Sequence, residues 1–138
     1  MSDSVGFTFT NSPAFDLSSA FVHLGDKGTT TVVPIDASFW ENMDPRFEQG
    51  RMVSIIESSE DWPNWEMHPE GEELIYLLSG RMTLVLDEAS GSFDRVDLRA
   101  GEATVVQRGI WHTADISEAG KALYITNGAG TQSRVRAG

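Results

Sequence analysis

Glycines divide the second half of the chain into short segments of similar length. From position 71 onward they recur every 8 to 11 residues, and the segments between them are rich in Val, Ile, Leu and Tyr. Turns at this spacing are typical of all-β sandwiches and barrels, whereas βαβ units need longer intervals with a helical period. The spacing therefore predicts an all-β fold and argues against a parallel α/β fold.

The clearest strand pattern lies between Arg81 and Leu98. Alternating apolar residues run toward a Ser-Gly pair at 90–91, which predicts a β-hairpin. Residues 37–43 predict one or two helical turns, and residues 131–138 predict a tail that is loose or covers a sheet edge. Further strands are expected in β-branched segments, at 20–25, 29–35, 51–57, 111–116 and 121–126.

The length and charge of the chain limit its partners. Its 138 residues suffice for one domain with a buried core. Ten Lys and Arg against 21 Asp and Glu give a net charge of −11, which repels nucleic-acid backbones and anionic membrane surfaces. The chain has no apolar run of about 18 residues and no signal-peptide pattern at its start. We therefore expect a cytoplasmic protein without nucleic-acid or membrane partners.

The chain contains no cysteine and only three histidines. Thiolate chemistry is thereby excluded, so any metal must be bound by His, Asp or Glu. Glu66 and His68 stand two residues apart, and on an extended chain they point to the same face, about 7 Å apart. If the chain reverses after Gly71, Glu73 returns opposite this pair, and one hairpin supplies three ligands.

His112 is a fourth candidate ligand, because it lies on a predicted strand after a turn at Gly109. Imidazole and carboxylate ligands together suit Fe, Mn, Ni or Zn, and the residues alone leave the metal open. His23 has no comparable pattern around it and is interpreted as a strand residue near a turn.

These two segments resemble the two signature motifs of the cupin superfamily, G-x5-H-x-H-x3,4-E-x6-G and G-x5-P-x-G-x2-H-x3-N. The matching positions are His68, Glu73, Gly80, Gly101, Gly109 and His112. Four positions depart from the motifs: Glu60 for the opening glycine, Glu66 for the first histidine, Gln107 for the proline and Ile116 for the asparagine. Of these departures, only Glu66 touches the implied metal.

The resemblance implies a double-stranded β-helix, the jelly-roll barrel of cupins, over about residues 50–127. Residues 1–49 would then supply strands that pack on the barrel or on a dimer partner, and residues 128–138 a C-terminal tail. The metal ligands implied are Glu66, His68, Glu73 and His112, holding one divalent ion. Two imidazoles and two carboxylates would make such a site costly to bury without a cation, so one carboxylate would take up a proton or turn aside.

A cupin with this site is expected to be a metal-dependent enzyme of dioxygenase, isomerase or lyase type, acting on a small polar organic molecule. Glu66 would be a ligand or would detach and act as a general base. The alternatives are a binding or sensing cupin without turnover and a barrel that only scaffolds a homodimer, and exposed sheet edges favour homodimerisation in each case. Pocket candidates near the ligands are Trp62, Trp65, Trp111, Tyr76 and Arg81, although such residues are as often found in a core, at an interface or facing solvent.

Overall fold

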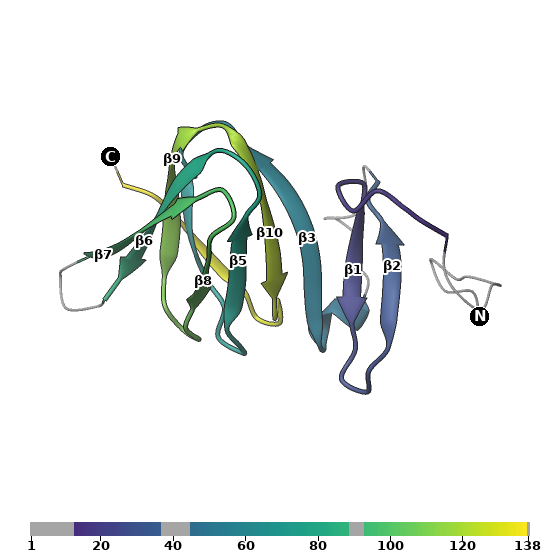
Figure 1. Ribbon diagram of the computed structural model, residues 1–138. Helices are drawn as coiled ribbons and strands as arrows, with labels where there is room; N and C mark the ends of the chain where they lie inside the picture. Colours follow the sequence, from purple (N-terminus) through teal and green to yellow (C-terminus); the bar gives the residue numbers. More distant parts are fainter. Residues whose placement is uncertain (1–12, 37–44, 89–92, 138) are drawn as a thin grey trace.

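The computed structural model describes residues 13–36, 45–88 and 93–137, and these form two antiparallel β-sheets (Figure 1). One short 3-10 helix, η1 (Pro45–Glu48), is the only helical element among these residues. The predicted helix at 37–43 and the predicted Ser-Gly turn at 90–91 lie outside the described residues. The all-β prediction is confirmed.

Each sheet draws strands from distant parts of the chain. The first sheet has the order β2 (Thr30–Pro34), β1 (Ala20–Leu24), β3 (Arg51–Ser58), β10 (Gly120–Thr126), β5 (Glu73–Leu77) and β8 (Ala103–Val106). The second has the order β11 (Gln132–Val135), β4 (Asn64–Met67), β9 (His112–Glu118), β6 (Arg81–Asp87) and β7 (Phe93–Arg99). From β3 to β6 and again from β7 to β11, successive strands alternate between the two sheets, which is the jelly-roll pattern that was predicted.

The strand predictions hold where the apolar pattern was clear. β6 and β7 pair as the predicted hairpin, with Met82 opposite Leu98. The segment at 131–138, predicted as a loose or edge-covering tail, contains β11, which pairs with β4 and so covers that edge.

The barrel core lies between the two sheets. On β5 every second residue is buried, so Glu73, Ile75 and Leu77 face inward while Leu74 and Tyr76 are less buried. Ile75 and Leu77 join apolar side chains of both sheets in one cluster, whose buried members are Ile75, Leu77, Met82, Leu84, Leu98, Val106, Ala114, Ala122 and Tyr124. Glu73 lies on the same face of β5 as this core.

The N-terminal hairpin extends the first sheet beyond the barrel. β1 pairs with β3, with Val22 opposite Val53, and the β1–β2 ribbon stands to one side of the barrel in Figure 1. Phe21, Val33 and Phe47 form a separate buried cluster against this ribbon. The molecule therefore has a barrel and an attached hairpin with a small core of its own.

Candidate metal centre

Glu66 and His68 lie on one stretch of chain and face the inside of the barrel. Glu66 is on β4, and His68 follows the last residue of that strand. Both side chains line the same cavity, as their two-residue spacing predicts. Trp65 immediately precedes Glu66, faces the opposite way and packs against Phe93 instead, with the ring centroids 5.5 Å apart.

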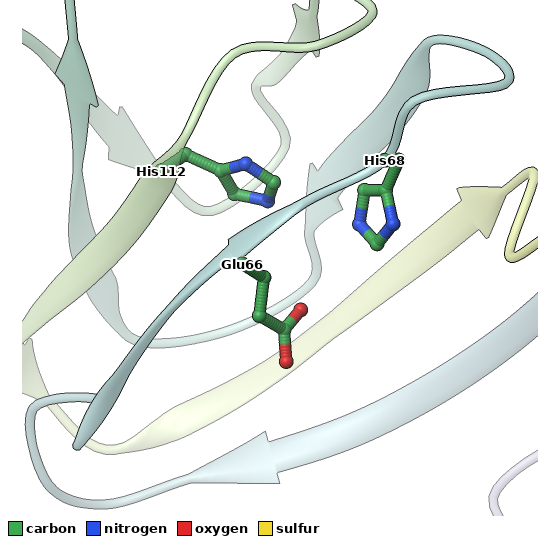
Figure 2. A group of neighbouring side chains, drawn as sticks. All are labelled: Glu66, His68 and His112. Carbon is green, nitrogen blue, oxygen red and sulfur yellow. The ribbon is translucent and has the colours of Figure 1, made fainter. Parts of the chain in front are cut away.

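His112 reaches the same place from the neighbouring strand. It begins β9 and stands directly opposite Glu66 in the antiparallel register. The candidate ligand atoms of Glu66, His68 and His112 all lie within 4.8 Å of one another. Figure 2 shows these three side chains gathered in one space between the strands.

Glu73 also reaches this cluster, but from the other sheet. The predicted hairpin is wrong in this respect, because β4 and β5 belong to different sheets and do not pair. The chain crosses between the sheets after His68. At Gly71 it passes close to the Asn127 side chain, and a Cβ added at this glycine would lie only 2.8 Å from the Cβ of Asn127. This crossing puts Glu73 Oε1 3.1 Å from His112 Nε2 and Glu73 Oε2 3.5 Å from His68 Nε2.

A second glycine joins the two motif segments. Gly109 has a φ of 78°, a conformation that favours glycine, in the turn that precedes β9. Its backbone N–H donates to the carbonyl of His68 at 3.0 Å. The segment carrying His112 is thereby fixed to the segment carrying His68.

The tautomer of His68 follows from its hydrogen bonds. Its Nδ1 lies 2.8 Å from Thr131 Oγ1, and that hydroxyl donates its own proton to the carbonyl of Gly128 at 2.8 Å. The hydroxyl is therefore the acceptor, and His68 Nδ1–H the donor. In the neutral ring Nε2 then carries a lone pair, and this buried atom makes no hydrogen bond, although Glu73 Oε2 lies 3.5 Å away. A buried lone pair that makes no hydrogen bond, beside two further potential metal ligands, fits a metal ion.

His112 is oriented in the same way. Its Nδ1 donates to the carbonyl of Ile110 at 3.1 Å, which leaves Nε2 facing the Glu73 carboxylate. A neutral Nε2 and a carboxylate oxygen are both acceptors, so a cation must lie between them, either a proton or a metal ion. Burial opposes charge on His112, yet the hydrogen bond to Glu73 raises the pKa of His112 above its usual value of 6.5.

The pKa values of the two carboxyl groups are shifted in opposite directions. Burial alone would raise the pKa of Glu73, but the His112 and His68 imidazoles lower it to about 2. The Thr126 hydroxyl also donates to Glu73 at 2.6 Å. For Glu66, burial and then the charge of Glu73 raise the pKa above its usual value of 4.5. The expected conflict between two buried carboxylates thus falls on Glu66, which takes up a proton more readily.

A cavity of about 430 Å³ opens beside the cluster, within the size range of small-molecule sites. Glu66, His68 and Glu73 line it from one side. Alternate residues of β3 form another wall: Met52, Ser54, Ile56 and Ser58. The sequence analysis did not identify this wall, although the same-face spacing of these four residues within the predicted strand at 51–57 was a usable signal.

The aromatic lining differs in part from the expectation. Trp62, one of the candidates, does line the cavity, together with Phe47 and Tyr124. Three other candidates, Trp65, Tyr76 and Trp111, do not line it. Arg81 does not line it either and is exposed.

Strand alternation is the reason for this difference. Trp65, Tyr76 and Trp111 each stand one residue from an inward-facing side chain, and adjacent residues on a strand face opposite ways. The Arg134 guanidinium lies over the rings of Trp111 and Trp65, 4.5 Å and 5.4 Å from their centroids. These two tryptophans thus belong to a second cluster, outside the cavity.

His23 takes no part in the metal cluster. Its Nε2 hydrogen-bonds the carbonyl of Gln49 at 2.6 Å, and its ring packs edge-on against Phe47 with the centroids 5.3 Å apart. It is a structural strand residue, as interpreted from the sequence.

The chain resembles several known proteins. The family model for the cupin domain, Cupin_2, matches residues 52–130, more than half of the chain. A search of curated proteins finds no match. No helix among the described residues is long and apolar enough to cross a membrane.

Among solved structures, a cupin-2 domain protein from Shewanella frigidimarina is 19% identical, with a TM-score of 0.47, and the match covers 54% of this chain and 68% of that one. Oxalate decarboxylase from Bacillus subtilis, in a study of its Mn(II) centres, is 16% identical, with a TM-score of 0.51. That match covers 62% of this chain but only 23% of the decarboxylase. At this identity the likeness concerns the fold. The family match and the two-sheet architecture together establish that this chain belongs to the cupin domain family.

Proposed function

We propose that this cupin is a metal-dependent enzyme that binds one divalent transition-metal ion through Glu66, His68, Glu73 and His112. The observation that carries the proposal is the buried Nε2 of His68, which makes no hydrogen bond and lies among the candidate ligand atoms of Glu66, Glu73 and His112. Two imidazoles and two carboxylates suit Fe, Mn, Ni or Zn. Such an ion, when bound, supplies a Lewis acid that polarises a substrate oxygen.

The arrangement around the cluster supports turnover as well as binding. The cavity adjoins the ligands, so a small organic molecule inside it lies next to the metal position. Glu66 lines this cavity and has a raised pKa, which suits a group that accepts and returns a proton. In this proposal His68, His112 and Glu73 hold the ion, and Glu66 alternates between ligand and general base.

Elemental analysis of the purified protein tests the metal site. We expect about one equivalent of transition metal in the parent and a large loss in His68→Ala and His112→Ala. His23→Gln is the matched control, because it removes the third buried histidine without touching the cluster. Equal metal content in all four proteins, or none in the parent, would contradict the proposal.

The enzymatic role needs a second measurement. The metal-loaded parent and Glu66→Gln should be compared over a panel of catechols and diketones, by oxygen uptake and by product analysis. We expect turnover in the parent and a loss of about 100-fold or more in the variant, the usual size of a general-base contribution. Turnover that survives unchanged in Glu66→Gln would remove Glu66 from the mechanism.

A further inference from the structure

The cavity beside the metal cluster is lined by no permanently charged cationic side chain. Its lining contains neither lysine nor arginine. All ten Lys and Arg of the chain lie in the described segments 13–36, 45–88 and 93–137, because the other segments contain none. The structure therefore places every lysine and arginine of the chain, and none of them lines the cavity.

The metal cluster itself does not compensate an anion. When Glu66 and Glu73 are both ionised they bring two negative charges, which balance a divalent ion and leave the centre without net charge. The chain as a whole has a net charge of −11, so its long-range field also repels anions. A substrate carboxylate would have to give up its hydration in this cavity without a counter-charge, which is costly.

The rest of the lining suits an apolar body. Phe47, Met52, Ile56 and Trp62 supply aromatic and aliphatic surface. The Trp62 ring lies 6.3 Å from that of His112 between centroids, so this surface continues up to the metal cluster. Uncharged hydrogen-bonding groups are interspersed with it, among them Ser54 and Ser58 on β3.

We infer that the cavity takes an uncharged organic molecule with an aromatic or apolar body and a hydroxyl or carbonyl oxygen directed at the metal cluster. This inference rests on the proposed metal centre for the orientation of the ligand, and on the lining, the two carboxylates and the net charge of the chain for the ligand's charge. It excludes dicarboxylates such as oxalate as substrates.

A matched pair of probes tests the charge preference. 2-Phenylethanol and phenylacetate have the same ring and nearly the same length, and they differ mainly in the charge of the oxygen-bearing end. Calorimetric titration of the Mn²⁺-loaded and EDTA-treated protein should show the alcohol binding at least tenfold more tightly than the carboxylate in both forms. Oxalate should bind to neither form.

Two arginine variants make the test specific to the cavity. Ser58→Arg places a cation on the half-buried end of the β3 wall, and Ser117→Arg places the same cation on an exposed position of β9 outside the lining. We expect Ser58→Arg to tighten phenylacetate binding about tenfold and Ser117→Arg to leave it unchanged. Equal changes in both variants would assign the effect to overall charge and overturn the inference.

The outcomes separate this inference from the proposed function. Metal content is measured independently on the same samples by elemental analysis. If the metal binds but phenylacetate binds as tightly as the alcohol, the inference fails and the metal centre stands. If the metal is absent but the preference for the alcohol persists, the cavity assignment stands and the metal centre fails. Failure of both probes to bind at millimolar concentration would also overturn the inference.

Discussion

His23 and His68 are buried to the same degree, with 7% and 6% of their surfaces exposed, yet they meet opposite surroundings. His23 sits in the N-terminal hairpin, where Nε2 is hydrogen-bonded to a backbone carbonyl and the ring packs on Phe47. In the barrel, Nε2 of His68 is buried and makes no hydrogen bond. The comparison teaches that burial does not distinguish these two histidines, whereas a ring nitrogen without a hydrogen bond, placed among other potential ligands, does.

The largest effect is expected from a change in the hairpin core. Phe21 is only 3% exposed and belongs to the cluster that supports β1 and β2. Phe21→Ala should lower the free energy of unfolding by about 3–5 kcal/mol, the usual cost of emptying a buried phenylalanine site. Denaturant titration measures this loss. Metal bound per folded molecule should be unchanged, and a parallel drop in metal would show that the two regions are not independent.

The next effect concerns the pH dependence of the metal-free protein. The pKa of Glu73 falls from 4.5 to about 2 on folding, so its stabilising contribution is complete above about pH 4.5 and is lost as the pH falls toward 2. The pKa of His112 is raised above 6.5, so its contribution is complete below pH 6.5 and is lost as the pH rises through the raised value.

Thermal unfolding of EDTA-treated protein should therefore show maximal stability between about pH 4.5 and 6.5. The loss of unfolding free energy on the acid side, which is due to Glu73, is on the order of 3 kcal/mol. Glu73→Gln should remove most of this acid-side dependence, while His23→Gln should preserve it. A flat profile in the parent would contradict the assigned charge states.

A smaller effect is expected from the hydroxyl that orients His68. Thr131→Val removes the acceptor of the His68 Nδ1 proton and leaves all four proposed ligands unsubstituted. Groups of this kind usually change metal affinity by about 10-fold to 100-fold, and we expect the lower end because His68 is also held by packing. Thr83→Val is the control, since it removes a threonine hydrogen bond that joins β6 to Asp97 on β7 and involves none of the proposed ligands. Competition with a metal chelator measures both variants.

The smallest effect should come from the outer tryptophan cluster. Arg134→Ala removes the guanidinium over Trp65 and Trp111 and its bond to Asp87. We expect a stability loss of about 1 kcal/mol, since such exposed cation–π and ionic contacts are weak. Binding of 2-phenylethanol should be unchanged. A tenfold loss of probe binding would contradict this expectation and indicate that the two tryptophans contribute to the binding site.

The sequence predicted those parts of the structure that depend on local pattern. Strand alternation gave the β6–β7 hairpin and the common face of Glu66 and His68, because side-chain direction follows from a period of two residues. The arrival of Glu73 from the opposite sheet was not predicted, since the path of residues 68–72 between sheets depends on packing far from these residues.

Pocket prediction failed for a related reason. Trp65 and Trp111 were chosen for their nearness in sequence to the ligands, yet adjacent residues on a strand face opposite ways. Thr131 was missed because it lies 63 residues after the histidine it orients. No local pattern connects two residues so far apart.

That separation has a consequence for how the protein is made. During synthesis His68 leaves the ribosome well before Thr131, so the imidazole exists for a time without the hydroxyl that selects its tautomer. His112 and Glu73 also emerge earlier than Thr131. An ion encountered at that stage meets ligands whose ring orientation is not yet fixed. In the proposed metal centre, selective binding of the ion would therefore follow the pairing of β11 with β4, which brings the adjoining Thr131 to His68.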